Sequence, residues 1–361
     1  MKIWNWQQKD WPNFSYNEDL ICDSENEFLK RCGQFLGIAK SITENDKKIL
    51  KIEIVSSEAF KTSEIEGEIL NHESLQSSIR RNFGLSASNK ATPKEDGIAE
   101  MFFDLYHNFN KDLTHKQLFL WHKMLFKENN KIEIAAYRTH KDAMQVVSGK
   151  IYDPKIHFEA PPAKSLKKEM DNFISWFNQS RKTMPTIVRA AITHLYFVSI
   201  HPFEDGNGRI ARALTIKAIS QSINEAALIT MSNTIQDKKK AYYLALERNN
   251  KSCKIDNWIN YFAKVLIEAQ KNTQKLAEFL LKKKNFYEKF QNLLNTRQGK
   301  VIAKVFKAGI NGFEGGLSAD NYLKITKTSR ATATRDLQEL VELKILTKTG
   351  EGRWMRYFLK I

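Results

Sequence analysis

Apolar residues recur at spacings of three and four along most of this chain, and that spacing predicts amphipathic helices. The pattern is helical from about residue 24 to 70. It gives two helices within 98–128, the second with Thr114 as a candidate N-cap. Further helices are expected at 165–180, 186–200, 210–222, 235–249 and 255–294. The second of these, "TIVRAAITHLYFVSI", is apolar on nearly every side, so we expect it to be buried.

Two stretches depart from this helical pattern. Residues 143–157, "MQVVSGKIYDPKIHF", place β-branched and aromatic residues around Ser148-Gly149, which predicts a β-hairpin. Residues 297–361 contain three short helices, the third capped by Ser329, and then two strands around Gly350 and Gly352. This order of elements is that of a winged helix-turn-helix.

The composition favours a mainly α fold, because the 361 residues include only 15 Gly and 7 Pro. Three cysteines, Cys22, Cys32 and Cys253, lie far apart and predict neither a disulfide framework nor a zinc site. The opening "MKIWNWQQKDW" lacks the apolar core of a signal peptide, and no apolar run reaches the roughly 18 residues of a membrane span. We therefore expect a cytoplasmic protein without a membrane partner. Its aromatic-rich residues 1–20 are expected to cover another surface.

The charge is distributed unevenly. The formal net charge is +16, and residues 271–361 contribute +11 of it, from 19 Lys or Arg against 8 Asp or Glu. Such an excess points to an anionic partner for the tail, with duplex DNA the first candidate. A solvated basic face or a generally lysine-rich composition would give the same excess, so charge alone leaves both explanations open.

The stretch with the most chemistry is "HPFEDGNGRIAR", residues 201–212. Its "GNG" triplet, 206–208, permits tight backbone angles directly before a helix. Free N–H groups and the positive helix end at such a place bind anions, phosphate above all. Arg209 and Arg212 lie three apart on the first turn of that helix and can form paired hydrogen bonds with the same anion.

An acid and a histidine complete this stretch. Asp205 stands among the positive charges, where its carboxylate can hold a Mg²⁺ that bridges phosphate oxygens. His201 follows the buried helix, which Pro202 ends, and its imidazole can accept a proton from an incoming hydroxyl. Each feature alone has a structural explanation: a helix-end histidine, a turn, or an ion pair. Together, within one short junction, they predict phosphoryl or nucleotidyl transfer.

At every specified position this stretch matches the Fic signature, HPFx(D/E)GNGRxxR, and the chain therefore resembles the Fic family. The resemblance extends to "AAYRTHKDAMQVVSGKIYDPKIHFEAPP", similar to the segment that leads into the family's flap hairpin. "KKKAYYLALERNN" is similar to the family's later helix beside adenine, so the resemblance covers roughly residues 95–265. It implies a mostly helical domain that transfers AMP from ATP to a protein hydroxyl.

Carried over by position, the resemblance gives each residue a role. His201 would be the base that deprotonates the acceptor hydroxyl, and Asp205 would carry Mg²⁺. ATP would lie on a set of backbone and guanidinium groups belonging to Gly206, Asn207, Gly208, Arg209, Ile210, Ala211 and Arg212. Tyr242 and Asn250 would contact adenine. Glycine at 208, where the family's kinase-like branch carries a bulkier residue, favours AMP transfer.

The stretch "KTSEIEGE" resembles the family's inhibitory pattern, (S/T)xxxE(G/N), through Thr62, Glu66 and Gly67. Thr62 and Glu66 are four apart and share one helix face. A carboxylate from Glu66 on Arg212 would occupy the anchor that the γ-phosphate needs, within the nucleotide site itself. We therefore expect autoinhibition by the N-terminal region, which Glu66→Gly should relieve. An exposed glutamate without this role is the alternative.

The tail supports a competing function, that of a DNA-binding regulator. The candidate DNA-binding residues lie on or near the third helix and in the wing: Lys327, Arg330, Arg335, Arg353 and Arg356. Such residues reach phosphates and base edges. Packing of this module on the rest of the chain, or recruitment of a protein target, is the alternative.

These observations predict a mainly α fold: a helical Fic domain with a β-hairpin flap, plus a C-terminal winged helix-turn-helix. The expected parts are a helical region with the inhibitory motif (1–90), the Fic catalytic domain (95–270) and the winged helix (290–361). The predicted activity is transfer of AMP from ATP to a Ser, Thr or Tyr hydroxyl of a target protein and of the chain itself. Removal of AMP, or transfer of UMP or phosphocholine, stays open at the same site. The resemblance also allows a homodimer.

Overall fold

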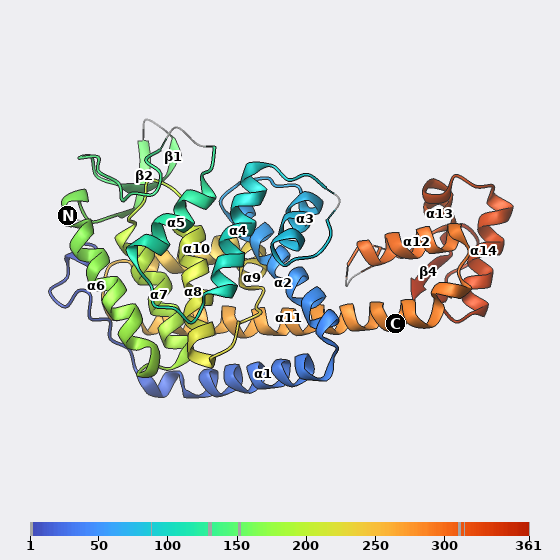
Figure 1. Cartoon of the computed structure of the whole chain (residues 1–361), viewed down its shortest axis with the longest axis horizontal. Helices are drawn as coiled ribbons and strands as arrows, with labels where there is room; N and C mark the ends of the chain where they lie inside the picture. The colour runs from blue at the N-terminus through green and yellow to red at the C-terminus, as the bar shows by residue number, and fades with distance from the viewer. Residues whose placement is uncertain are drawn as a thin grey trace. The chain divides into compact units, whose positions relative to one another are not determined.

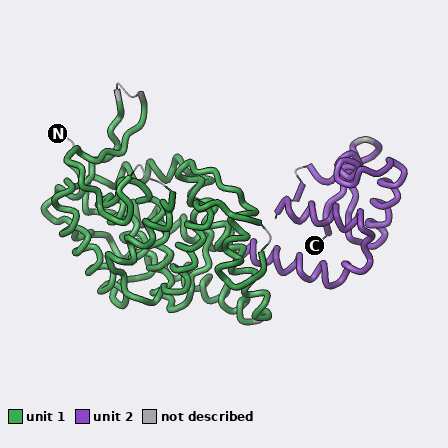
Figure 2. Tube along the Cα trace, turned by 45° about the horizontal axis from the view of Figure 1, so that its top comes forward, with its two compact units in different colours: residues 1–273 green, residues 274–361 purple. Residues whose placement is uncertain are grey.

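The computed structural model describes residues 3–87, 89–128, 132–150, 153–309, 312–313 and 315–360. Its fold is mainly α, as predicted, with two small antiparallel sheets of two strands each (Figure 1). The chain divides into two compact units, Met1–Thr273 and Gln274–Ile361 (Figure 2). Within the described residues, no helix combines the length and the apolar character needed to cross a membrane.

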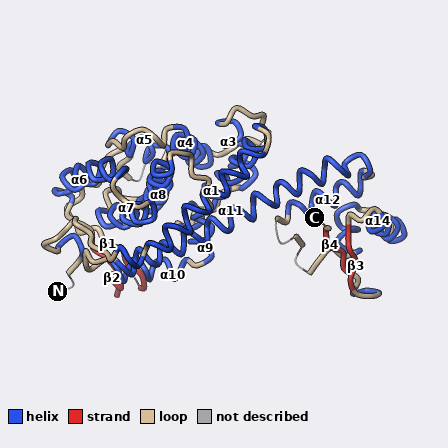
Figure 3. The backbone as a smooth tube through the Cα atoms, turned by 90° about the horizontal axis from the view of Figure 1, so that it is seen from below, coloured by secondary structure: helices blue, strands red, loops and turns tan. Residues whose placement is uncertain are grey.

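Helices make up most of the first unit (Figure 3). They are α1 (Cys22–Ser41), α2 (Glu44–Ile65), α3 (His72–Asn82), α4 (Pro93–His107), α5 (His115–Leu125), α6 (Leu166–Gln179), α7 (Thr186–Ile200), α8 (Asn207–Ile223), α9 (Met231–Asp237) and α10 (Lys239–Asn249). The helix α11 (Asp256–Phe290) begins in the first unit and ends in the second. The helical pattern predicted from about residue 24 to 70 corresponds to two helices, α1 and α2, because Thr43 starts a new helix by accepting a hydrogen bond from the Asp46 N–H.

The centre of the first unit is the pair α7 and α8, which lie side by side with the other helices around them (Figures 1 and 3). Nearly every residue of α7 is buried, as its apolar sequence predicts, and α8 is also buried along most of its length. Residues 201–206 join the two helices directly. A short connection between two buried helices leaves its backbone little freedom, so this junction is a rigid place for chemistry.

A β-hairpin lies beside this helical core, formed by β1 (Gln145–Lys150) and β2 (Asp153–Glu159) and called the flap below. Its strands pair from Gln145 with Glu159 to Lys150 with Asp153, and the register shifts between Val146 and Val147. The hairpin is confirmed, but the turn predicted at Ser148-Gly149 is wrong. Both residues continue β1 and pair with β2, because Gly149 tolerates its φ of +97° inside the strand.

The second unit follows the predicted order of three helices and two strands. These are α12 (Thr296–Lys307), α13 (Ala319–Thr326), α14 (Arg330–Glu342), β3 (Leu346–Thr349) and β4 (Arg356–Leu359). Ser329 caps α14 as predicted, since its hydroxyl accepts a hydrogen bond from the Thr332 N–H at 3.3 Å. Whether this unit is a functional winged helix-turn-helix stays a prediction.

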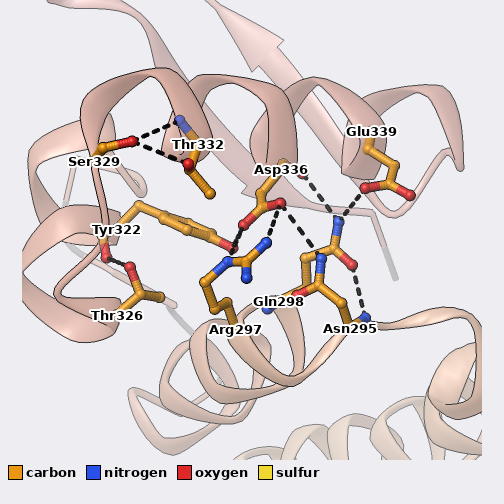
Figure 4. Close-up of polar contacts among 9 residues, drawn as sticks. All are labelled: Asn295, Arg297, Gln298, Tyr322, Thr326, Ser329, Thr332, Asp336 and Glu339. Atoms are coloured by element: carbon orange, nitrogen blue, oxygen red, sulfur yellow. Dashed lines mark hydrogen bonds and ion pairs between the residues drawn. The ribbon is translucent and has the colours of Figure 1, made fainter.

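A buried acid fixes the inner face of α14 in the second unit (Figure 4). The Asp336 carboxylate accepts hydrogen bonds from Arg297 Nε at 2.7 Å and from the Tyr322 hydroxyl at 2.9 Å. Gln298 donates to the backbone carbonyl of Asp336 and to the Glu339 carboxylate. Partners from α12 and α13 therefore hold α14, so its outer face is presented on a fixed support.

Candidate active site

The junction after α7 holds a histidine in an unusual backbone conformation. His201 has φ +49°, in the left-handed region that non-glycine residues seldom adopt. The buried Arg138 supports it, because Arg138 Nε donates to the His201 carbonyl at 2.9 Å and the Arg138 N–H donates to the Pro202 carbonyl at 3.0 Å. Sequence reasoning missed Arg138, which lies 63 positions earlier in the chain.

His201 is held as a neutral imidazole. Its Nδ1 lies 3.3 Å from the Val198 carbonyl, which can only accept a hydrogen bond, so Nδ1 carries the proton and the lone pair lies on Nε2. Burial lowers the pKa of His201 to about 4, and the nearby positive charge of Arg138 also lowers it. At neutral pH the residue is therefore a free base with one nitrogen available to take a proton.

The loop after His201 ends in an anion-binding geometry. Gly206 is the N-cap of α8 with φ +82°, and a β-carbon there would lie 2.8 Å from the Phe126 ring. The Asn207 side chain closes the loop, since it donates to the Phe203 carbonyl at 2.8 Å and accepts from the Phe203 N–H at 3.0 Å. Because a glycine N-cap has no side-chain acceptor, the first N–H groups of α8 remain available to an anion.

The end of α2 brings an acid to the first two turns of α8. Arg212 is fully buried, and its Nη2 lies 2.7 Å from a Glu66 carboxylate oxygen. Arg212 Nε donates to the Thr62 hydroxyl at 2.6 Å, and Nη2 also donates to the Thr62 carbonyl at 2.9 Å. The residues of the predicted inhibitory motif thus meet the predicted phosphate anchor. Within the described chain, Arg212 Nη1 has no hydrogen-bond partner.

A second carboxylate from the same segment pairs with the other arginine. Gly67, at φ +81°, turns the chain after α2, and Glu68 then lies with a carboxylate oxygen 2.6 Å from Arg209 Nη1. The Arg209 side chain is 2% exposed and also stacks on the Phe126 ring, with 4.9 Å between the guanidinium carbon and the ring centroid. Sequence reasoning missed Glu68. Residues 62–68, called the inhibitory segment below, therefore occupy both guanidinium groups.

Glu66 and Arg212 are both ionised in their pair. Burial alone would raise the pKa of Glu66, but the charge of Arg212 and its hydrogen bond outweigh burial and hold that pKa below its ordinary value. Burial would likewise lower the pKa of Arg212, and the Glu66 charge raises it instead. Gly208 makes room for this contact, since a β-carbon there would lie 2.3 Å from a Glu66 carboxylate oxygen.

A cavity of about 770 Å³, called the nucleotide cavity below, joins these parts to the flap. Its lining comes from the α7–α8 junction, the flap and α10, and includes Glu66, Val146, Phe158, Ser199, His201, Asp205, Asn207, Gly208, Tyr242 and Asn250. Most of the predicted catalytic and nucleotide-binding residues therefore face one space. Ile210 and Ala211 instead have side chains buried in the hydrophobic core, so their predicted contact with a nucleotide is left to the backbone.

The Tyr242 hydroxyl already has a structural partner. Thr215 donates its hydroxyl proton to the Ala211 carbonyl, so its oxygen accepts from His194 Nδ1 at 3.2 Å. His194 Nε2 is then the acceptor for the Tyr242 hydroxyl at 2.8 Å. Burial lowers the pKa of His194 to about 3, which agrees with this neutral form. Tyr242 therefore presents its ring, rather than its hydroxyl, to the cavity.

Asp205 fits the requirements of a Mg²⁺ carboxylate. Its side chain is 58% exposed, with one oxygen accepting from the Gly206 N–H at 2.6 Å and the other 3.7 Å from Arg209 Nη2. The described residues contain no cluster of three or more metal-binding side chains. Mg²⁺ bound by one carboxylate together with phosphate oxygens needs no such cluster, so the donor set suits a cation that arrives with a nucleotide.

The predicted DNA-binding residues belong to the second unit. Lys327, Arg330 and Arg335 are exposed, and Arg356 is partly buried. The side chain of Arg353 lies outside the described part of the structure.

Comparison with known proteins identifies two family models along the chain. The Fic/DOC family matches residues 112–219, and a domain of unknown function (DUF4172) matches residues 4–85. Protein adenylyltransferase fic-1 of Caenorhabditis briggsae is 34% identical over 105 residues, which are 27% of this chain and 21% of that protein. Uridine 5'-monophosphate transferase of Xanthomonas campestris is 43% identical over 58 residues, or 14% of this chain and 11% of that protein. The chain therefore spans about a fifth or less of the length of these relatives.

A solved structure matches nearly the whole chain. A Fic family protein from Desulfovibrio desulfuricans G20 aligns with a TM-score of 0.58 and 18% identity, covering 97% of this chain and 98% of that one. At this identity the match establishes a shared fold and nothing about substrate.

Proposed function

The chain belongs to the Fic family through the domain that holds this site, and from that premise we propose that it transfers AMP from ATP to a hydroxyl of a protein. The observation that carries the proposal is the meeting of a neutral His201 and the first residues of α8 at one cavity. Two buried arginines of α8, Arg209 and Arg212, lie behind that lining and pair with Glu68 and Glu66, of which Glu66 lines the cavity. A base beside a phosphate site is the arrangement that nucleotidyl transfer needs.

Binding would begin with the phosphates. The first N–H groups of α8 and the positive end of that helix would hold phosphate oxygens, and Arg209 and Arg212 would neutralise their charge. Asp205 is the residue that would hold Mg²⁺, which when bound neutralises phosphate charge in the transition state. The adenine would lie beside Tyr242 and Asn250, where the Asn250 Oδ1 is buried without a partner among the described residues.

The chemical step would be an in-line displacement. The acceptor oxygen forms a bond to the α-phosphorus while the bond from that phosphorus to the bridging oxygen of the β-phosphate breaks, so pyrophosphate leaves. His201 Nε2 takes the proton of the hydroxyl, and the hydrogen bond from Nδ1 to Val198 keeps the ring in the tautomer that permits this. The flap would hold the target segment by strand pairing along β1, next to His201.

The inhibitory segment would act as a brake on this reaction. Glu66 and Glu68 pair with the two arginines that phosphates would otherwise engage. A carboxylate cannot coexist with a phosphate on the same guanidinium donors without repulsion, so ATP would bind with its phosphates displaced from the position that transfer needs. Transfer would then require withdrawal of the segment.

The test is incorporation of AMP from α-labelled ATP into the protein itself. Glu66→Gly should raise incorporation at least about tenfold, because removing one charge-assisted contact weakens the brake by more than 1.4 kcal/mol. Adding His201→Ala should lower the incorporation by about 100-fold or more, since a general base contributes that much. Glu64→Gly, the same substitution two residues earlier, is the control and should stay near wild type. Equal incorporation with and without His201 would contradict the proposal.

The enzymatic alternatives use the same site and need separate measurements. Labelled UTP and CDP-choline in place of ATP test transfer of UMP and phosphocholine, and release of label from an AMP-modified protein tests the reverse activity. The relatives bear names of both AMP and UMP transferases, so these measurements decide which nucleobase the transferred nucleotide carries. Stronger transfer from UTP than from ATP would replace the proposed substrate while leaving the roles of His201 and the arginines intact.

A second function, binding of duplex DNA, is proposed for the second unit. Its observation is the exposure of Arg330 and Arg335 on α14 and of Lys327 at the end of α13, while Asp336 anchors α14 to α12 and α13 (Figure 4). A helix held from behind with basic residues outward fits the major groove.

Fluorescence anisotropy of a labelled duplex with the full chain tests this binding. Arg330→Ala with Arg335→Ala should weaken binding about tenfold and reduce the slope of affinity against salt by about two, because two phosphate contacts are lost. Lys304→Ala removes an exposed charge from α12 and is the control. Binding that is absent at low salt, or insensitive to the double substitution, would favour a role in contacting protein instead.

A further inference from the structure

The first residues of the described chain form part of the nucleotide cavity's support. Residues 3–16, called the N-terminal strap below, precede α1 and contain one turn of 3₁₀ helix, Asn5–Gln7. Trp4 is buried and Asn5 has an exposed fraction of 0%. An asparagine without exposure must have its hydrogen-bonding groups satisfied by the fold. The strap is therefore fixed to its surroundings, in agreement with the prediction that the aromatic N-terminus covers another surface.

The strap holds the flap at its base. Trp4 packs edge-to-face on Phe158 of β2, with 5.4 Å between ring centroids. Trp6 Nε1 donates to the Glu159 carbonyl at 2.7 Å. Phe158 also lines the nucleotide cavity, so the ring that Trp4 holds is part of the cavity wall. The two tryptophans thus tie the last residues of β2 to the N-terminus.

The strap also reaches the end of α7. Asn5 Nδ2 donates to the Ser199 hydroxyl at 2.8 Å, and both residues are buried. Ser199 lines the cavity and precedes His201 by two residues. The Asn5 Oδ1 accepts from the Trp6 N–H at 2.9 Å, so one side chain connects the turn of the strap to the helix that carries the base.

The third contact is with the wall beyond α10. The Asn5 N–H donates to the Asn250 carbonyl at 2.9 Å. The Asn250 side chain in turn donates to the His157 carbonyl of β2 at 2.9 Å. Further along the strap, Ser15 exchanges hydrogen bonds with Cys253 and Ile255 at 2.8 and 2.9 Å. The strap therefore joins the flap, the end of α7 and the wall that holds Asn250.

We propose that Asn5 and Trp4 are positioning residues of the proposed nucleotidyl transfer: Asn5 sets the nucleotide wall, and Trp4 sets the flap against which a target segment would pair. The proposal rests on the proposed function for the identity of the ligands. It gives the first residues of the region matched by the domain of unknown function a role at the active site. Neither side chain lies among the cavity lining, so each acts through Asn250, Ser199 or Phe158.

Separable effects are expected from the two residues. Asn5→Ala keeps the backbone hydrogen bond to Asn250 but removes the side-chain bonds to Ser199 and to the Trp6 N–H, which fix the turn that carries that backbone N–H. It should therefore weaken binding of a non-hydrolysable ATP analogue about tenfold, the value of one buried hydrogen bond. Trp4→Ala leaves those bonds but frees Phe158, so it should speed hydrogen exchange in residues 145–150 and 153–159 about tenfold. In the Glu66→Gly background, Asn5→Ala should raise the KM for ATP at nearly unchanged kcat.

The experiment uses the full chain with Trp11→Ala as the matched control. Trp11 lies in the same strap, but its ring packs on Tyr196 and Phe14 and its Nε1 donates to Glu169. Trp11→Ala should leave analogue binding and flap exchange near wild type. Trp4→Phe keeps an aromatic edge on Phe158 and should restore slow exchange, and Asn5→Ser serves if the alanine variant does not fold.

The proposal would be overturned if Asn5→Ala bound the analogue as tightly as Trp11→Ala does, and if the flap of Trp4→Ala exchanged as slowly as that of Trp11→Ala. The same holds if Trp11→Ala alters both readouts equally, because the strap would then act only through overall stability. Neither readout requires AMP transfer. A protein that binds the analogue but transfers no AMP would count against the proposed function and leave this test intact.

Discussion

Two ion pairs, Glu66 with Arg212 and Glu68 with Arg209, join the segment after α2 to α8. Glu66 with Arg212 follows from a known kind of motif, whereas Glu68 with Arg209 depends on the left-handed turn at Gly67. Both guanidinium groups are almost fully buried, and a buried charge that loses its partner is costly. The pairs therefore hold residues 62–68 against α8, and in the proposed function a phosphate would have to replace each carboxylate.

Glutamine variants separate the two contributions. Glu66→Gln and Glu68→Gln should each tighten ATP-analogue binding several-fold, and the double variant should tighten it by more than either, because each removes one competing charge. Glu64→Gln, which removes a charge that faces Lys61 instead, is the control. Isothermal titration measures the affinities. A Glu68→Gln affinity equal to wild type would show that Arg209 does not take part in phosphate binding or that its pair with Glu68 does not compete.

The sequence predicted those residues whose chemistry is local. His201, Asp205, the "GNG" triplet and the arginines lie within twelve positions, so spacing alone brings them together. Glu68 and Arg138 were missed, since their partners lie 141 and 63 positions away and only the fold brings them into contact. A single acid or arginine carries no pattern that would mark it in advance.

The contact between α4 and α5 depends on one glycine. A β-carbon at Gly97 would lie 1.9 Å from the Met124 carbonyl oxygen, and a backbone oxygen cannot move aside as a side chain can. The two helices therefore approach at a distance that only glycine permits. In contrast, a β-carbon at Gly33 in α1 would have nothing within 4 Å.

Alanine at these two glycines should have opposite effects. Gly97→Ala should lower the free energy of unfolding by roughly 2 kcal/mol or more, because α4 and α5 must separate. Gly33→Ala should raise it by about 0.5–1 kcal/mol, because alanine favours an exposed helix interior. Urea unfolding followed by circular dichroism measures both. Destabilisation of similar size at both positions would contradict the close packing of α4 on α5.

The hydrophobic spacing predicted which elements form but not where helices break or how the strands pair. The helical pattern over 24–70 is two helices with a break before Thr43, and the helix predicted over 235–249 is interrupted at Lys238. Hydrophobic spacing does not mark either break, because helical spacing continues across both. Ser148-Gly149 has a turn composition but pairs within β1. The pairing register of β1 depends on β2, and the local composition around Ser148-Gly149 gives no information about that pairing.

Buried histidines make the stability of the first unit depend on pH. Burial lowers the pKa of His122 and His201 to about 4 and of His194 to about 3, against 6.5 when exposed. As pH falls below 6.5 the unfolded chain takes up these protons and the folded chain does not, so stability is lost. Burial raises the pKa of Glu58 to about 7, and its proton uptake in the folded state offsets part of that loss.

The first unit should therefore lose on the order of 3 kcal/mol of unfolding free energy between pH 7 and 5. The second unit contains none of the eight histidines, so it serves as an internal reference in the same sample. Urea unfolding read by pulsed hydrogen exchange and mass spectrometry reports each unit from its own peptides. Equal shifts in the two units, or a first unit that gains stability at pH 5, would be inconsistent with buried neutral histidines.

Transfer of the nucleotidyl rather than the terminal phosphoryl group is tested most directly by the position of the label. Glu66→Gly protein is incubated with ATP labelled at the α- or the γ-phosphate, and covalent label on the protein is measured. Attack at the α-phosphorus beside His201 predicts that the α-label stays on the protein and that the γ-label leaves with pyrophosphate. It also predicts that His201→Ala lowers the incorporation by about 100-fold or more. Retention of the γ-label alone, or of neither label in the Glu66→Gly protein, would contradict it.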